Sequence, residues 1–521
     1  MTDPTSSANG AHYNSRLLTS MLAETDAPAF HIGNQTWSRA QFAQHSRRLA
    51  AGLAAAGVQP GDRVALHLEN GPEIMVAYLA CFRIGAIAVA MYPRYEGAEL
   101  ESMLRRIRPA IYIGHPTLYQ RVEPIAADVL SPSRRFVVGG SADGSARPWT
   151  ILHQATPAAP HRDVDAHAPA VLIATSGTTG QPKLVAHSQA SLAGLAKKAP
   201  FREIRPGQRM AFSLQMSQMS GLSHIMGGLF NDAMMVVVDP IDTAGMLDTI
   251  QKQHCTYLAA VPAVLKQIIG LQRREPRDVN SLRFCIALAD VCEPSLQSAF
   301  EAVFGLPLRT MWSSTEAAGS LTYGLLPGAV SRLVPGTELR LVDADGRKVM
   351  HRERGEMLLR ADNVALGYWR GPGEWGGFPD GWCPTGDLMR NDKDHNLWFE
   401  GRVKDLIERN RVKISPVEVE RALARHPAVA DAGVTSRPDP ILGHRVVALV
   451  QLADGTNPDR LDDIRQSMIK HLTADTMPDG IAAVSKVPRT PAGKLDRKEL
   501  AISGASEVCN CSVRVGQKDI R

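Results

Sequence analysis

The sequence lacks the features that mark secreted, membrane-spanning and nucleic-acid-binding proteins. Its 521 residues include only seven cysteines, an odd number scattered along the chain, which argues against a framework of disulfides. No apolar run reaches the roughly eighteen residues of a membrane span, since Arg83 interrupts the best candidate, residues 74–91. The net charge is only +5, and no basic run or stripe of basic and aromatic residues stands out. We therefore expect neither a membrane nor a nucleic acid as a partner.

The composition is that of an ordinary globular protein, with 44% apolar and 21% charged residues. The N-terminal segment is polar and has no charged region followed by an apolar one, which predicts a cytoplasmic location. Cys509 and Cys511 form a C-x-C pair in a polar tail, where a metal site would need further ligands, so we expect reduced thiols. A chain of this length is too long for one core and should form two or more domains.

Helix and strand signals alternate in the first half of the chain, which predicts an α/β fold. A capping box of Ser38 and Gln41 should begin a helix that ends at Gly57, and residues 64–68 alternate like a half-buried strand. The alternation continues through Val261 and favours parallel sheets covered by helices. The sequence thus predicts a large N-terminal domain of sheets covered by helices.

A second, smaller α+β domain is predicted from residue 404 onward. Ser415 and Glu418 form another capping box, with Pro416 at the first helical position. Strands at residues 429–434 and 445–452 and a helix at residues 461–472 should follow. The expected divisions are residues 1–403 for the large domain, 404–503 for a small mobile domain and 504–521 for a disordered tail, with residues 155–169 as a linker inside the first.

The most informative segment is the loop TSGTTGQPK at residues 175–183, which directly follows the apolar run at residues 171–174. Glycines let backbone N–H groups turn toward a ligand, while hydroxyls and a lysine add donors and positive charge, which suits a polyphosphate. The plain alternative is a solvated linker, which fits the composition but not the abrupt strand before it. The candidate phosphate-binding residues are Thr175, Ser176, Gly177, Thr178, Thr179, Gly180 and Lys183.

This loop is not a Walker A sequence, because Gly177 and Gly180 are too close and Lys183 is followed by Leu184. It resembles the signature loop of the adenylate-forming superfamily, which contains acyl-CoA synthetases, peptide-synthetase adenylation domains and beetle luciferases. The resemblance implies that the loop holds the β- and γ-phosphates of ATP. Further family segments follow in the family's order up to residue 494. The N-terminal helix–strand unit and residues 61–64 are similar too, so the resemblance covers nearly the whole chain.

The segment WSSTE at residues 312–316 is similar to an aromatic-Gly-x-Thr-Glu motif of that family, with Ser313 in place of glycine. The resemblance implies that Trp312 packs on adenine, that Thr315 meets the α-phosphate and that Glu316 holds Mg²⁺, for which a carboxylate is suited. Taken alone, the segment is also compatible with an ordinary exposed turn.

Two later segments complete the resemblance. Asp387 in Thr-Gly-Asp is implied to accept the ribose hydroxyls with the help of Arg402, although the tripeptide alone is common in turns. Lys494 in PRTPAGKLDR is implied to bridge the acid substrate and the α-phosphate, although a lone lysine after such a turn is ordinarily a solvated charge. The family's hinge, about which the small domain rotates, falls on Lys404.

The chain departs from the family where the acid should bind. Gln218 stands where the family often has a histidine, or an acidic residue in members that bind an α-amino acid. Because no carboxylate is present there to pair with an ammonium group, an α-amino acid substrate is not expected. Bulkier residues at 287–290 replace a Gly-Gly-Ala segment, which favours a small or flat acid. Methionines near Gln218 either line a pliable pocket or fill the core. The implied pocket residues are Gln218, Met219, Gly221 and Ala289, with Asp290 beside the nucleotide.

A third departure is Arg411, where the family has glycine in a turn that lines the pantetheine tunnel. Arg411 either narrows that tunnel or contacts a phosphate, and Asn410 can supply the positive φ that the turn needs. The resulting hypothesis is an ATP- and Mg²⁺-dependent ligase that forms an acyl-adenylate from a small carboxylic acid. Its acceptor is expected to be CoA first, then phosphopantetheine on an acyl carrier protein, then an amine. A non-catalytic nucleotide-binding protein is the remote alternative, although such a protein should have lost Glu316 or Lys494.

Overall fold

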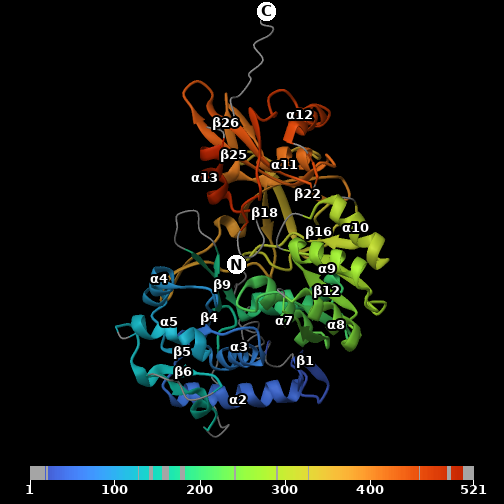
Figure 1. Cartoon of the computed structure of the whole chain (residues 1–521). Coiled ribbons are helices and arrows are strands. Elements are labelled where there is room, and N and C mark those ends of the chain that lie inside the picture. The colour runs from blue at the N-terminus through green and yellow to red at the C-terminus, as the bar shows by residue number, and fades with distance from the viewer. Residues whose placement is uncertain are drawn as a thin grey trace, which may run out of the picture.

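The computed structural model has a large N-terminal domain and a smaller C-terminal domain, drawn in blue to yellow and in orange to red in Figure 1. It describes residue 18 and residues 22–126, 128–139, 145–154, 164–175, 182–239, 242–288, 292–326, 328–453, 455–456, 458–489 and 495–507. Within these ranges, none of the helices combines the length and the apolar character that a membrane crossing needs.

The first sheet of the large domain is parallel except at one end, where β1 and β2 form an antiparallel pair. Among the described residues its seven strands follow the order β14-β13-β12-β10-β11-β1-β2. Because neighbouring parallel strands run the same way, the carboxyl ends of β10, β12, β13 and β14 lie along one edge. The bounds are β1(Pro28–Ile32), β2(Gln35–Ser38), β10(Arg209–Phe212), β11(Met234–Val237), β12(Tyr257–Ala260), β13(Phe284–Ala287) and β14(Leu308–Thr310).

The second sheet contains the strand that precedes the predicted phosphate loop. Its nine strands within the described ranges follow the order β20-β19-β9-β8-β4-β3-β5-β6-β7, with antiparallel pairing confined to β8, β9, β19 and β20. The bounds are β3(Arg63–His67), β4(Ile87–Ala90), β5(Ile111–Gly114), β6(Arg135–Val137), β7(Arg147–Pro148), β8(Pro169–Thr175), β9(Lys183–Ser188), β19(Gly367–Gly371) and β20(Glu374–Gly376).

Helices cover both sheets, as the alternating pattern predicts. The side chains of α2, α3, α6 and α7 share one hydrophobic core with apolar residues from both sheets. The outer face of the first sheet packs against α8, α9 and α10, and that of the second against α4 and α5. The bounds are α2(Arg39–Ala55), α3(Pro72–Ile84), α4(Gly97–Ile107), α5(Pro116–Ala126), α6(Gln189–Lys197), α7(Met219–Phe230), α8(Thr243–Gln253), α9(Pro262–Arg274) and α10(Pro294–Phe304).

The helix α2 confirms the first capping box, because the amide of Gln41 donates to Ser38 Oγ and the amide of Ser38 donates to Gln41 Oε1. Two such bonds satisfy donors that a helix start otherwise leaves free. The helix ends at Ala55, and Gly57 follows with a φ of 86°. The strand predicted at residues 64–68 is β3.

An antiparallel sheet of β17, β18, β21 and β22 leads out of the large domain, and its core includes Trp312. A short pair, β15 and β16, adjoins it. The bounds are β15(Leu321–Thr322), β16(Arg332–Leu333), β17(Glu338–Val342), β18(Gly355–Arg360), β21(Cys383–Asn391) and β22(Leu397–Arg402). A 3₁₀ turn at Val403–Asp405 joins β22 to the small domain, whose core begins at Ile407.

The small domain pairs β25, β26 and β27 in one sheet and β23 with β24 in a hairpin. Apolar side chains of α11 and α12 cover the sheet, as the α+β prediction requires. The bounds are β23(Ile407–Arg409), β24(Val412–Ile414), β25(Val429–Asp439), β26(Gly443–Leu452), β27(Gly480–Ala483), α11(Pro416–Ala424), α12(Leu461–Met468) and α13(Arg497–Glu507).

Two local predictions for this domain need correction. Ser415 does precede α11, but it forms no capping box, because its hydroxyl donates to the carbonyl oxygen of Glu400 at 2.6 Å. The helix α13 runs to Glu507, past residue 504 where a disordered tail was predicted to begin. Cys509 and Cys511 lie outside the described residues.

Candidate active site

Two of the predicted site segments follow the carboxyl ends of parallel strands in the same sheet. The segment at 312–316 follows β14, and residues 214–222 follow β10. Ligands of open α/β sheets ordinarily bind outside the carboxyl ends of the strands. This strand order therefore explains how segments about a hundred residues apart reach one place.

Trp312, Asp387 and Arg402 form one cluster, which we call the Asp387 cluster. The indole Nε1 of Trp312 donates to Asp387 Oδ2 at 2.6 Å, and Arg402 Nε lies 2.9 Å from Asp387 Oδ1. Arg402 is the direct register partner of Asp387 across the β21–β22 pair. The three residues predicted to hold the adenosine part of ATP are thus in contact.

The Asp387 carboxylate is almost entirely removed from water, with 3% of the residue exposed. Burial raises the pKa of Asp387, because a charged carboxylate is poorly solvated there. Arg402 and the Trp312 indole oppose that rise, and the charge of Glu316 adds to it. Asp387 Oδ1 has no hydrogen-bond partner among the described residues beyond its ion pair with Arg402, so this buried oxygen can accept from a ribose hydroxyl.

Glu316 lies beside the end of the predicted phosphate loop. The hydroxyl of Tyr368 on β19 donates to Glu316 Oε1 at 3.0 Å, and Lys183 Nζ lies 4.7 Å from the centre of the Tyr368 ring. Burial, and then the Glu316 charge, raise the pKa of Tyr368, so its hydroxyl stays protonated and can donate. We call Glu316, Tyr368 and Lys183 the Glu316 cluster. The sequence predicted site roles for Glu316 and Lys183 but not for Tyr368, because no motif marks this tyrosine in its short aromatic strand.

Thr315 is held through its backbone by a histidine that no sequence motif marks. His187 is fully buried on β9, and its Nε2 donates to the carbonyl oxygen of Thr315 at 2.8 Å, while Nδ1 lies 3.1 Å from Ser191 Oγ. Burial lowers the pKa of His187 to about 4, so the imidazole is neutral at physiological pH. His187 therefore ties the strand after the phosphate loop to the segment that carries Thr315.

The predicted acid-binding segment is clamped through its backbone. The Asn70 side chain donates to the carbonyl oxygen of Leu214 at 2.9 Å and accepts from the amide of Met216 at 2.8 Å, and Tyr78 donates to the Met216 carbonyl oxygen. The chain then turns so tightly that a Cβ at Gly221 would lie 2.0 Å from the carbonyl oxygen of Gln215. Only glycine fits that approach.

Gln218 is the partly exposed N-cap residue of α7, without a side-chain capping bond. Its neighbour Met219 is buried in the main hydrophobic core, and Met216 and Met226 lie in the same core. Of the two interpretations of these methionines, the structure supports core filling.

Several predicted residues lie outside the described part of the chain. The residues that flank them are placed: Thr175 pairs with Lys183 across the base of the phosphate loop, and Arg489 pairs with Leu495 across the base of the loop that contains Lys494. The residues outside are Ser176, Gly177, Thr178, Thr179, Gly180, Ala289, Asp290 and Lys494.

The Lys494 loop is anchored by two forked ion pairs. The guanidinium of Arg489 donates to both oxygens of Asp431, at 2.8 and 2.7 Å. That of Arg497 donates to both oxygens of Glu420, at 2.6 and 3.0 Å. Such bidentate pairs fix direction as well as distance, so both ends of the loop are held on the body of the small domain.

Lys404 and Arg411 lie on the connection to the small domain. Lys404 is exposed in the 3₁₀ turn between β22 and β23. Asn410 and Arg411 form the two-residue turn of the β23–β24 hairpin, with φ of 49° and 65°. The sequence predicted that Asn410 takes the positive φ instead of Arg411, but both residues adopt it, because the favoured two-residue hairpin turn requires it twice.

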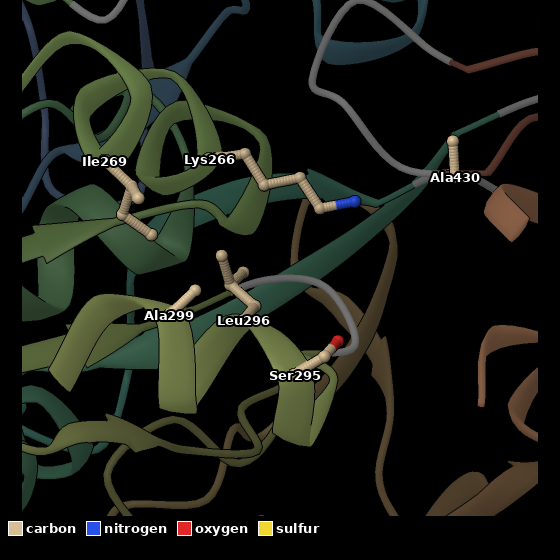
Figure 2. Close-up of a pocket in the computed structure, with 6 residues that line it drawn as sticks. All are labelled: Lys266, Ile269, Ser295, Leu296, Ala299 and Ala430. Carbon is tan, nitrogen blue, oxygen red and sulfur yellow. The ribbon is translucent and has the colours of Figure 1, made fainter. Parts of the chain in front are cut away.

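A pocket of about 250 Å³ lies where the two domains meet, and Figure 2 shows it. Its walls come from α9 and α10 on one side and from Ala430 of the small domain on the other, with Lys266 extended toward Ala430. It shares no residue with the Asp387 or Glu316 cluster.

A comparison with known families identifies both domains. Residues 19–369 match the AMP-binding enzyme family, and residues 418–494 match the AMP-binding enzyme C-terminal domain. The chain belongs to the AMP-binding enzyme family. The predicted membership of the adenylate-forming superfamily is confirmed, and with it the expectation of an AMP-forming ligase with a large and a small domain.

Three similar proteins illustrate the range of this family. The chain is 28% identical to indoleacetate–CoA ligase of Aromatoleum aromaticum, over 92% of this chain and 95% of that one. It is 30% identical to salicyl-AMP ligase / salicyl-S-ArCP synthetase of Mycobacterium tuberculosis, over 90% and 85%. It is 25% identical to the solved amide bond synthetase McbA of Marinactinospora thermotolerans, with a TM-score of 0.84 over 94% and 99%.

Proposed function

We propose that the protein uses ATP to activate a small carboxylic acid and then transfers the acyl group to an acceptor. A carboxylate oxygen attacks the α-phosphorus of ATP while the bond from that phosphorus to the bridging oxygen breaks. Acyl-adenylate and pyrophosphate are the products. The observation that carries the proposal is the contact of Trp312, Asp387 and Arg402 beside Glu316, in a chain of the AMP-binding enzyme family.

The residues of the two clusters suit the parts of ATP. Trp312 offers an aromatic face for adenine, and Asp387 offers a buried acceptor for the ribose hydroxyls. Lys183, at the base of the predicted phosphate loop, supplies positive charge for the β- and γ-phosphates that leave as pyrophosphate. Thr315 and Lys494 act at the α-phosphate, where the lysine ammonium stabilises negative charge as it builds on the oxygens.

Magnesium fits the Glu316 cluster. Mg²⁺ is ordinarily held by one or two carboxylates together with phosphate oxygens, and Glu316 Oε2 has no hydrogen-bond partner among the described residues. Bound there, the ion would neutralise phosphate charge. Tyr368 fixes the other oxygen of Glu316 and so orients the carboxylate toward the nucleotide.

CoA is the first choice of acceptor, followed by phosphopantetheine on a carrier protein and then by an amine. The small domain would rotate about Lys404 after adenylation, withdrawing Lys494 and admitting the acceptor. The three similar proteins above are named for ligation to CoA, for a carrier-protein product and for amide synthesis. Arg411, an arginine on an exposed turn, favours the two acceptors that bear phosphate over an amine.

The test is isotope exchange between pyrophosphate and ATP over a panel of carboxylic acids. The panel is run in parallel with CoA, a carrier protein and amines to identify the product. Exchange with at least one acid is expected. Absence of exchange with every acid, in protein that still binds ATP, would support the alternative of a non-catalytic nucleotide-binding protein.

Lys494→Ala provides the mechanistic control. It should lower exchange by roughly 10²- to 10³-fold, the range for loss of one group that stabilises developing charge. An unchanged rate in this variant would contradict the role given to the lysine.

A further inference from the structure

The segment that carries Glu316 is fixed to the fold through backbone groups. The carbonyl oxygen of Glu316 accepts from the amide of Ala365 at 2.8 Å. Two residues further on, the carbonyl oxygen of Ala318 accepts from Asn363 Nδ2 at 2.7 Å. The same Nδ2 donates to Ser320 Oγ at 2.9 Å, and Asn363 and Ser320 are both fully buried. One amide side chain therefore sets where the residues after Glu316 lie.

The orientation of the Asn363 amide is decided by a buried lysine. Lys198 directly follows α6 and is 7% exposed. Its Nζ donates to Asn363 Oδ1 at 2.6 Å and to Asp362 Oδ1 at 2.6 Å. An ammonium group only donates hydrogen bonds, so it must face the oxygen of the amide and not the nitrogen. The amide nitrogen then faces the opposite way, where it donates to Ala318.

The two contacts of Lys198 differ in their surroundings. The side chain of Asp362 is 68% exposed, so water screens this ion pair and its contribution to stability is small. The contact with Asn363 is buried, and a hydrogen bond from a charged donor is roughly twice as strong as a neutral one. The ammonium therefore restrains Asn363 more firmly than it restrains Asp362.

The segment beyond Glu316 packs so closely that a reversed amide would displace it. Gly319 has a φ of 79°, and a Cβ there would lie 3.3 Å from Leu195 of α6 and 3.7 Å from Asn363 Nδ2. A reversed Asn363 would place its oxygen against the carbonyl oxygen of Ala318, and neither group could donate. A shift of about 1 Å in reacting groups can cost roughly 10²-fold in rate.

We propose that Lys198 is a positioning residue for the adenylation reaction. Its ammonium orients the Asn363 amide, and this amide holds the backbone of the segment that presents Thr315 and Glu316. Lys198 touches neither of these two residues, so it acts only through Asn363. This inference rests on the proposed adenylation activity and adds a residue that no sequence motif marks.

The loss of Lys198 should affect kcat more than nucleotide binding. The amide of Trp312 is held separately, by Ser331 Oγ at 2.9 Å, and the indole of Trp312 donates to Asp387. Lys198→Met should therefore lower kcat for pyrophosphate exchange by roughly ten- to hundred-fold. KM for ATP should change by about three-fold or less, because the contacts proposed for adenosine remain.

Three matched variants separate positioning from charge pairing. Lys197→Met removes the neighbouring lysine, which has no hydrogen bond or ion pair in the described part of the chain, and should leave kcat unchanged. Asp362→Asn removes the exposed countercharge but keeps the contact of Lys198 with Asn363, so it should cost about three-fold or less. Asn363→Asp still accepts from Lys198 but cannot donate to Ala318, so it should lower kcat as much as Lys198→Met does.

A pocket beside this contact allows the ammonium to be supplied from solution. The pocket has a volume of about 440 Å³, and its lining includes Gly194 and Lys197 of α6 and the Lys198 partner Asp362. Lys198→Ala lacks three carbons and the ammonium group, which propylammonium contains. Propylammonium should restore kcat of Lys198→Ala, whereas propanol, which has a similar size and no charge, should not. Neither compound should change kcat of the wild type.

Hydrogen–deuterium exchange of the backbone gives a readout that needs no turnover. Amides of residues 314–322 should lose protection in Lys198→Met and in Asn363→Asp, and keep it in Lys197→Met. If no acid supports pyrophosphate exchange in the wild type, the adenylation proposal fails. The protection of this segment then still decides whether Lys198 orders it.

Four results would overturn the proposal. The first is a wild-type kcat in Lys198→Met or in Asn363→Asp, and the second is unchanged protection of the segment in both variants. The third is a loss in Asp362→Asn as large as that in Lys198→Met, which would make the ion pair the decisive contact. The fourth is equal restoration of Lys198→Ala by propanol, which would show that the lysine only fills space. If Lys198→Met does not fold, Asn363→Asp and the restoration of Lys198→Ala decide the question.

Discussion

The hydrogen bond from Trp312 to Asp387 should control how tightly the protein binds ATP. Trp312→Phe keeps an aromatic face for adenine but removes the indole N–H, which donates to Asp387 Oδ2 at 2.6 Å. The carboxylate is only 3% exposed, so water cannot readily replace the lost donor. A hydrogen bond to a buried charged group contributes about 1.5–3 kcal/mol. The variant should therefore raise the pKa of Asp387 further, in the direction that burial already drives it.

The effect on ATP follows from the orientation of the carboxylate. Losing one well-placed ribose hydrogen bond should cost about 1–1.5 kcal/mol, which corresponds to a roughly ten-fold weaker ATP affinity. Calorimetric titration of ATP into the wild type, Trp312→Phe, Asp387→Asn and the double variant completes a cycle. A coupling of about 1 kcal/mol or more between positions 312 and 387 is expected.

Trp369→Phe is the matched control for this cycle. Trp369 is 1% exposed, and its Nε1 has no hydrogen-bond partner in the described part of the chain, so the same change in volume removes no indole hydrogen bond seen there. This control should lose stability but keep its ATP affinity and show no coupling to Asp387. A Trp312→Phe variant that binds ATP as tightly as the wild type, with no coupling in the cycle, would refute the role given to the indole.

Three further predictions concern the metal site, the acceptor turn and acid stability. Glu316→Gln should reduce pyrophosphate exchange by roughly 10²-fold or more, because it removes the carboxylate proposed to hold Mg²⁺. Tyr368→Phe removes only the hydrogen bond that orients this carboxylate, so it should reduce exchange by about ten-fold and raise the Mg²⁺ concentration needed for half-maximal rate. Equal losses in the two variants would contradict a binding role for Glu316 and an orienting role for Tyr368. Arg411→Gly should raise the free energy of unfolding of the small domain by about 1 kcal/mol and raise KM for CoA with unchanged exchange; an unchanged KM would exclude a contact with the acceptor. The third prediction concerns the buried histidines His67, His187 and His224, whose pKa values fall from 6.5 to about 4 in the fold. Because the unfolded chain binds protons between these two pH values and the fold does not, the free energy of unfolding measured with denaturant should fall as the pH drops from about 6.5 to about 4, by about 3 kcal/mol per histidine at most. A flat profile would show that the imidazoles are protonated in the fold.

Much of the fold and part of the site follow from local sequence patterns. The capping box at Ser38 fixes the start of α2 because both of its partners lie within one turn. Trp312, Asp387 and Arg402 could be assigned together because each belongs to a motif whose order in the chain is characteristic of a family. These motifs can be recognised without knowing which residues touch. In the structure, Trp312 and Arg402 both contact Asp387.

The missed residues act through single contacts between distant segments. His187 and Thr315 are separated by 128 residues, and Tyr368 and Glu316 by 52. Nothing in the local pattern of either pair distinguishes a histidine or tyrosine that positions a site from one that only packs. The same reason explains the wrong capping box at Ser415, whose hydroxyl donates to the carbonyl oxygen of Glu400 on β22 at 2.6 Å and accepts no bond from an amide of α11.

The turn at Asn410 and Arg411 shows how a departure from the family can carry information about function. The positive φ of 65° at Arg411 costs about 1–2 kcal/mol of conformational energy that glycine would not incur. Asparagine at position 410 does not remove this cost, because the turn needs positive φ at both residues. In the ranges that the structure describes, no hydrogen bond or ion pair of the Arg411 side chain accompanies this turn. Strain of this kind persists where it serves binding or a conformational change. An exposed guanidinium held at the tip of the β23–β24 hairpin is suited to the phosphates of an acceptor, and it offers nothing to a neutral or cationic amine. The effect of Arg411→Gly on KM for CoA therefore tests whether this guanidinium contacts the acceptor.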